Sequence, residues 1–288
     1  MSGPRGTSGA AAAGLNACLA SALDYAGLFP PAALEMPEAL ANYRRYAAAR
    51  ERWALGRFVV PVGRLEEMEQ SAPTPAALPA TIAVVGTDDA EGDARAIAAY
   101  NARHPGKSLV DVVEARTGGT EATARRAAAS AGLTCYCEIA PGHPVLGRLL
   151  EAAAAAGCRA KLRTGGVELG AIPAPELVLN FIARCARLRL PFKCTAGLHH
   201  ALRGRYPLTY AADAPTAVMH GYLNIMLATH ALLANADLDA ARALLHAETP
   251  GALGLERWGP EQIAQTRDIF VAFGTCSFEE PLECLPTF

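Results

Sequence analysis

Short apolar segments alternate along this chain with longer segments rich in alanine and arginine, and no other feature constrains its fold as strongly. Apolar runs of strand length bounded by Gly, Pro or polar residues indicate β-strands, and the segments between them are typical of helices. The predicted strands span residues 23–29, 57–62, 81–86, 109–114, 134–139, 159–164, 191–196 and 270–275. Eight strands joined by helical crossovers predict a single closed parallel barrel of the α/β class, the (β/α)8 or TIM barrel.

The structural alternative is an open doubly wound sheet, which usually carries a glycine-rich phosphate loop after its first strand. Here the first strand leads through Gly27 and Phe29 into Pro30 and Pro31, and no such loop follows. We therefore expect one barrel domain over residues 1–288, with a mobile N-terminus over 1–20. The segment 199–259 is longer than one crossover requires, so we predict a lid-like helical insertion between the seventh and eighth strands.

The composition limits the classes of partner. The formal net charge is −2 and the basic residues are scattered, so we expect no nucleic acid. The alanine run at residues 10–13 is too short for a membrane span or a signal peptide, so we expect no membrane contact and a cytoplasmic protein. Eight cysteines without paired C-x-x-C motifs indicate reduced, buried residues. Cys135 and Cys137 share one face of a predicted strand, but two sulfurs alone do not make a structural zinc site.

Lysine is rare in this chain, because only three of its 26 basic residues are lysines. Two of them, Lys161 and Lys193, lie in consecutive predicted strands, close to the end of each. Arginine stays protonated, whereas a buried or crowded lysine can lose its proton and act as a nucleophilic amine. The pair is therefore a candidate catalytic site. The alternative is that both are ordinary cations at strand ends.

The carboxyl ends of the strands form the active site of a TIM barrel, and both lysines belong to that end. Equivalent positions on adjacent strands lie side by side, so Lys161 and Lys193 are expected to face each other across the mouth. Two ammonium groups at close range repel, so one amine should be free near neutral pH to attack a carbonyl and form a Schiff base. A nearby acid, Asp111 or Glu138, would then move protons.

Four segments resemble the deoxyribose-phosphate aldolases, a family of class I aldolases that work through a lysine Schiff base. They are residues 161–165 (KLRTG), 192–198 (FKCTAGL), 110–113 (VDVV) and 273–277 (FGTCS). The resemblance implies a barrel aldolase that needs no cofactor. It implies that Lys161 forms the imine, that Lys193 is the cation that favours the free amine, and that Asp111 is the proton shuttle.

The same resemblance implies a substrate site around these strands. The turn from Gly274 to Ser277 is similar to the phosphate-binding turn of the family. The expected partner is a small-molecule carbonyl compound, and a homo-oligomer is left open. With the other polar residues that follow the predicted strands, the expected substrate-binding residues are Arg163, Thr164, Thr195, His199, His200, Gly274, Thr275 and Ser277.

Several residues depart from the family pattern. Arg163 stands where the family usually has a small hydroxyl residue, and a guanidinium there predicts contact with an anionic group of the substrate. Glu279 and Glu280 follow the phosphate-like turn, and their charges predict a substrate without phosphate. Apart from the family pattern, some polar residues at the strand ends will be pairing partners and not catalysts, and the simpler interpretation of Glu114 and Arg116 is an ion pair at the rim. The segment 24–31 and the region after residue 199 have no clear counterpart in the family.

The histidines support a competing hypothesis. His199, His200 and His220, with Asn224 one helical turn later, could join Glu138 or Asp111 around a divalent metal in a hydrolase or isomerase. Their spacing matches no strong metal motif, so the simpler interpretation is two loop histidines and one packing histidine. A third hypothesis is a barrel that binds a small molecule without chemistry, which Arg163 in the Schiff-base strand would favour.

Overall fold

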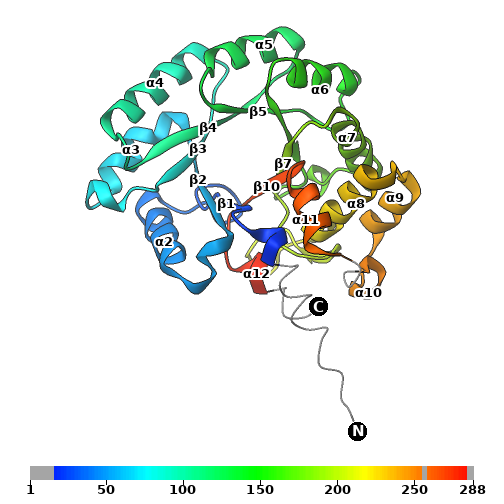
Figure 1. The fold of residues 1–288 in the computed structure, drawn as a ribbon. Coiled ribbons are helices and arrows are strands. Elements are labelled where there is room, and N and C mark those ends of the chain that lie inside the picture. The colour runs from blue at the N-terminus through cyan, green and yellow to red at the C-terminus, as the bar shows by residue number, and fades with distance from the viewer. Residues whose placement is uncertain (1–15, 255–257, 284–288) are drawn as a thin grey trace.

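Eight parallel strands close into a barrel in the computed structural model, which describes residues 16–254 and 258–283 (Figure 1). The strands follow one another around the barrel in chain order, and the last strand pairs with the first to close it. The predicted TIM barrel is therefore confirmed. The barrel strands are β1 (Leu23–Tyr25), β2 (Leu55–Pro61), β3 (Thr81–Val85), β4 (Leu109–Arg116), β5 (Thr134–Glu138), β6 (Arg159–Arg163), β7 (Phe192–Thr195) and β10 (Phe270–Thr275).

Helices surround the strands, as Figure 1 shows for the run from α2 to α8. The helices are α2 (Met36–Ala48), α3 (Leu65–Ser71), α4 (Ala90–Arg103), α5 (Thr120–Ala129), α6 (Leu146–Ala155), α7 (Pro175–Leu188), α8 (Tyr222–Asn235), α9 (Leu238–His246), α10 (Pro250–Leu253), α11 (Pro260–Arg267) and α12 (Glu280–Glu283). Short 3-10 turns span Arg50–Ala54, Val62–Arg64, Pro75–Ala77 and Leu169–Ala171.

Helix α7 illustrates how the sequence builds this layer. Proline at its first position has the φ that a helix start requires, and Arg189 ends the helix in the left-handed conformation at φ 50°. Val178, Phe181 and Ile182 recur at helical spacing and are fully buried. The segment Leu169–Leu188 is long and apolar enough to cross a membrane by length and composition. Val178, Phe181 and Ile182 of this segment form the buried face of a barrel helix, whereas Leu169 and Leu177 are exposed.

Alternation along the strands separates two sets of side chains. Outward residues such as Val113 join the large core between the strands and the helices. Inward residues form a smaller cluster inside the barrel that contains Val59, Ala83, Val112 and Tyr136. Inward side chains nearer the carboxyl ends of the strands point into the mouth of the barrel.

The segment predicted as a helical lid divides into two parts. Strands β8 (Gly204–Pro207) and β9 (Thr216–Met219) form an antiparallel hairpin of their own, and it is this hairpin that reaches the mouth. Helices α8 and α9 instead pack against each other and against α7 on the side of the barrel. Helix α8 is buried almost throughout, so it belongs to the outer helical ring rather than to a lid. The hairpin was not predicted.

The N-terminus predicted to be mobile covers residues 1–20. Residues 1–15 lie outside the described residues. Cys18 and Leu19 are buried in the core between the strands and the helices, so the end of the predicted mobile segment is packed.

Candidate functional site

A cavity of about 550 Å³ opens at the carboxyl ends of the barrel strands. This volume suits a small molecule, and cavities of this kind usually combine apolar walls with a few polar groups. Phe29, Val59, Val85, Leu208 and Met219 contribute apolar wall. The charged residues that line it are Glu114, Arg116, Glu138, Lys161, Arg163 and Lys193, together with Asp88 at the edge.

The two lysines are neighbours, as the sequence predicted. Their Cα atoms are register partners on β6 and β7, and Glu138 on β5 is in turn the partner of Lys161. Gly165 and Gly197, which follow the two strands, come so close that a Cβ on either would lie 3.0 Å from the other's Cα. Gly197 also has φ +74°, so glycine is favoured there for two reasons.

A carboxylate lies between the two ammonium groups. Glu114 on β4 accepts from Lys193 at 2.5 Å on one oxygen and contacts the Lys161 Nζ at 2.8 Å with the other. The direct ammonium repulsion expected from the sequence is therefore replaced by a bridge through Glu114. All three side chains are almost completely buried, and charges so buried are tolerated only when they are paired.

The ammonium group of Lys193 is buried and contacts two carboxylates. Its Nζ also donates to Asp24 at 2.5 Å, and its side chain is 1% exposed. Burial alone would lower the pKa of Lys193, but the carboxylates of Asp24 and Glu114 outweigh burial and raise that pKa well above its ordinary value. Lys193 is thus a fixed cation in this site.

Glu114 is held as a carboxylate by the same contacts. Burial alone would raise its pKa, but the charges of Lys161 and Lys193 outweigh burial and lower the pKa of Glu114 to about 2. It therefore remains ionised across the physiological range. Because it lies between Lys161 and Lys193, Glu114 neutralises the charge of both ammonium groups.

Lys161 and Glu138 lie at the outer side of the network. The Lys161 Nζ is 2.9 Å from Glu138 Oε2, and the Glu138 side chain is 14% exposed against 2% for Glu114. Burial would raise the pKa of Glu138, but Lys161 outweighs burial and holds it below the ordinary value, with help from Arg116. Arg116 donates to Glu138 at 3.4 Å. Both acids line the cavity, and Glu138 is the more exposed of the two.

Asp111, the other predicted acid, is not part of this cavity. Its carboxylate accepts two hydrogen bonds from the Arg57 guanidinium, at 2.8 and 2.6 Å. It precedes Glu114 by three residues on β4, which places it about 10 Å nearer the amino end of the strand. The β3–β4 register also shifts beside it, since Ile82 pairs with Val110 but Ala83 pairs with Val112. The prediction that Asp111 joins the lysines was wrong.

Glu114 and Asp24 are the residues that sequence reasoning missed. Glu114 was expected to pair with Arg116 at the rim, yet it is buried between the lysines, and Arg116 contacts Glu138 instead. A signal was present, because Glu114 lies two residues after the inward Val112 and therefore shares its face. Asp24 carried no comparable signal, since β1 is only three residues long.

The predicted substrate-binding residues divide between cavity and scaffold. Arg163, Thr195, His199 and Gly274 line the cavity. Thr164 is buried and donates to the Ala196 carbonyl at 2.6 Å, so it fastens β6 to the loop after β7. The turn at β10 is also internally bonded, because the hydroxyl of Thr275 donates to the Ser277 carbonyl at 2.6 Å. Thr164, Thr275, Ser277 and His200 are not among the lining residues.

The three histidines of the metal hypothesis have separate partners. His199 Nδ1 lies 2.8 Å from Glu280, and the His200 ring stacks on Tyr206 at 3.5 Å between centroids. His220 donates from Nε2 to the Pro173 carbonyl at 2.8 Å. Asn224 does not join them either, because its amide bonds the backbone of 203, 244 and 247. Among the described residues, these groups do not converge on a shared ligand position.

Several solved structures are similar to this chain. QR15, described as an aldolase, matches with a TM-score of 0.50 at 9% identity, over 93% of this chain and 96% of that one. A provisionally assigned deoxyribose-phosphate aldolase from Toxoplasma gondii ME49 matches with a TM-score of 0.48 at 14% identity, over 90% and 95%. A lysine/ornithine decarboxylase from Vibrio vulnificus matches at 0.38 and 13%, over 64% of this chain, which spans only 48% of its length.

No protein-family model matches the chain, and no curated protein sequence matches it. At 9% identity the likeness to QR15 shows a common barrel architecture. The architecture does not determine the reaction, because barrels of one architecture carry many reactions, so the residues of the site decide the chemistry.

Proposed function

We propose that this protein is an aldolase-like lyase that forms a Schiff base between Lys161 and a small carbonyl compound. The observation that carries the proposal is the position of the Lys161 Nζ, in the cavity and between two carboxylates at 2.8 and 2.9 Å. Lys193 fits a supporting role instead, because it is the more deeply buried of the two and is held by Asp24 and Glu114.

The first step needs a proton to leave Lys161, and Glu138 is the acceptor at hand. Transfer over 2.9 Å gives a neutral amine and a neutral acid, so the net charge of the network does not change. The amine adds to the substrate carbonyl and gives a carbinolamine. Glu138 then returns its proton to the carbinolamine hydroxyl, which leaves as water and yields the iminium.

The network favours the iminium for an electrostatic reason. An iminium on Nζ carries the same single positive charge, at the same atom, as the ammonium that Glu114 and Glu138 already hold. Carboxylates preorganised around that charge need little rearrangement during the reaction.

The iminium then accepts the electron pair of the bond between the α and β carbons of the substrate and becomes an enamine. Breaking this bond is the step that makes the protein a lyase. The β-hydroxyl gives its proton to Glu138 and leaves as the carbonyl of the released fragment. Return of that proton to the enamine carbon and addition of water free the second product and Lys161.

Borohydride trapping tests the proposal directly. Incubation with a panel of small aldehydes and ketones, then reduction, intact mass measurement and peptide mapping, should place a stable adduct on Lys161. A parallel sample treated with a strong chelator tests the competing metal hypothesis. Equal trapping in both samples supports imine chemistry, whereas turnover that requires an added metal and leaves no adduct supports the histidine alternative.

The change Glu138→Gln should slow imine formation by about 10²- to 10⁴-fold, because glutamine cannot accept or return the proton. Stopped-flow absorbance or the rate of borohydride trapping measures this step. Asp111→Asn is the matched control, since Asp111 pairs with Arg57 outside the cavity. Equal slowing in both variants, at unchanged thermal stability, would contradict the assignment of Glu138 as the proton carrier.

The position of Arg163 indicates that the substrate carries an anionic group. This residue lines the cavity, is exposed, and its Nε donates to the Gly165 carbonyl. Arg163→Met should raise KM about 10- to 100-fold for carbonyl substrates with a carboxylate or phosphate, since a charge-assisted hydrogen bond contributes about 1.5–3 kcal/mol. The neutral analogues should change little. Parallel KM measurements on charged and neutral substrates decide this.

A further inference from the structure

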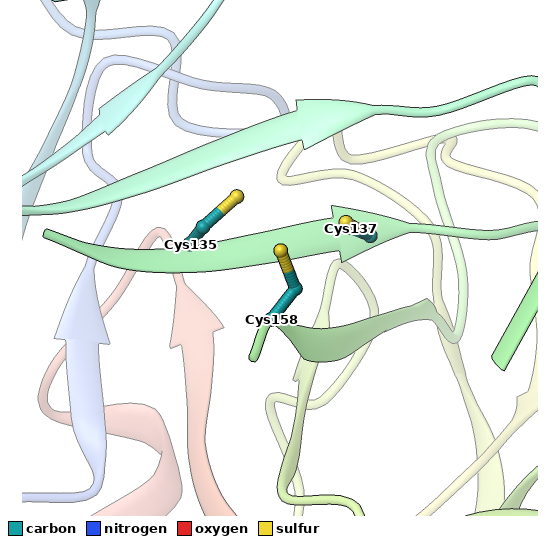
Figure 2. Close-up of side chains that lie close together, drawn as sticks. All are labelled: Cys135, Cys137 and Cys158. Atoms are coloured by element: carbon teal, nitrogen blue, oxygen red, sulfur yellow. The ribbon is translucent and has the colours of Figure 1, made fainter. Parts of the chain in front are cut away.

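Three cysteines gather on the outer side of the barrel, away from the lysines. Cys135 and Cys137 lie on β5, and Cys158 directly precedes β6. Figure 2 shows their sulfurs turned toward one another, with the Cys158 side chain directed at β5. The three Sγ atoms all lie within 4.8 Å of one another.

The strand pairing explains this convergence. Tyr136 pairs with Arg159 and Cys137 with Ala160, so the register places Cys158 beside Cys135. Cys135 and Cys137 are two residues apart and share the outward face of β5, while Tyr136 between them points into the barrel. The third sulfur is therefore brought in from a neighbouring strand. The sequence spacing alone could not show this.

The surroundings of the cluster are apolar. The three side chains are 0–5% exposed and belong to the core beneath the helical layer. No His, Asp or Glu of the described residues joins the sulfurs as a further ligand. Cys135 and Cys158 lie toward the amino ends of β5 and β6, whereas Cys137 is the residue before Glu138 at the end of β5. Cys158 directly follows the exposed Gly157, which has φ +69°.

We propose that Cys135, Cys137 and Cys158 form a binding site for one soft metal ion, Cu(I), held by three sulfurs. Thiolates select Cu(I), zinc or iron–sulfur clusters. A structural zinc ion takes four ligands in a tetrahedron, and iron–sulfur clusters are commonly held by four cysteines. Three sulfurs in an apolar setting fit Cu(I), which accepts low coordination numbers. Binding displaces thiol protons to solvent and transfers no electron.

This site is independent of the proposed lysine chemistry. The three cysteines belong to the core on the outer face of the strands, whereas Lys161 and Glu138 line the cavity inside the barrel. An ion held by β5 and β6 cross-links two strands and should stabilise the native state, because it binds the folded chain only. Turnover and the Lys161 adduct should remain unchanged.

The full-length protein, reduced and kept without oxygen, is titrated with Cu(I) against a competing chromogenic chelator. We expect one ion per chain, a rise in Tm of several degrees and an X-ray absorption spectrum with three sulfur neighbours. Cys137→Ala should reduce the affinity at least about 100-fold, whereas Cys18→Ala, a buried cysteine outside the cluster, should bind as before.

The absorption spectrum of the unaltered protein keeps the proposal testable if Cys137→Ala does not fold. Two sulfur neighbours, no binding, or equal binding by both variants would overturn it. A separate titration with zinc distinguishes the ions. Tighter binding of zinc than of Cu(I) would overturn the choice of ion and the three-coordinate geometry.

Discussion

Replacing Lys161 with arginine should abolish the borohydride-trapped adduct and lower turnover by at least about 10³-fold. Arginine preserves the positive charge that Glu114 and Glu138 neutralise, but a guanidinium cannot lose its proton and attack a carbonyl. The stability of the variant should change much less than its activity. Intact mass after borohydride treatment, together with a thermal melt, separates the two effects.

The chain offers a matched control in its third lysine. Lys107 is exposed and far from the barrel mouth, so Lys107→Arg should retain the full adduct and full turnover. Lys193→Arg gives the second comparison, since the role proposed for Lys193 is that of a fixed cation. An adduct that persists in Lys161→Arg, or that maps to Lys193 by peptide sequencing, would reverse the assignment of the nucleophile.

The change Glu114→Gln should reduce the free energy of unfolding by about 3–5 kcal/mol near pH 7, because it leaves two buried ammonium groups short of their shared counter-charge. The pH dependence identifies the cause. The pKa of Glu114 is about 2 in the folded protein against an ordinary 4.5. Its stabilisation is therefore complete above about pH 4.5 and is lost as the pH falls toward 2.

The shift in the pKa of Glu114 corresponds to about 3 kcal/mol, so the difference in stability between the unaltered protein and Glu114→Gln should narrow steadily below pH 4.5. Urea unfolding at several pH values measures this difference. The control is Glu121→Gln, whose side chain is 91% exposed, and its effect should be small at every pH. A difference between Glu114→Gln and the unaltered protein that stays constant down to pH 3 would show that Glu114 is not the linked group.

The barrel was predictable because its signal repeats. Each buried strand is a short apolar run bounded by Gly, Pro or polar residues, and eight such runs support one another. The prediction for residues 270–275 matches β10, and most of the other strands differ by only one or two residues at their ends. The first strand differs most, because residues 26–29 are apolar but lie in a turn that leads to the cavity.

The site was predictable only where position along a strand decides it. Lys161 and Lys193 are register partners, so their juxtaposition follows from the barrel alone. The exclusion of Asp111 depends on a local register shift and on depth inside the barrel, which a single sequence does not show, whereas the spacing from Val112 does indicate the face of Glu114. The cysteine cluster and the hairpin at the mouth depend on contacts between different segments of the chain, which the local pattern of apolar and polar residues does not predict.

The hairpin of β8 and β9 forms part of the cavity wall although it lies outside the barrel sheet. Its strands pair only with each other, outside the closed barrel, yet Leu208 and Met219 line the apolar wall of the cavity. Exchanges in this hairpin can therefore reshape the chamber without disturbing the strands that hold the lysines. The lysine pair and its carboxylates can stay in place while exchanges in this short hairpin alter the part of the cavity wall that meets a bound small molecule.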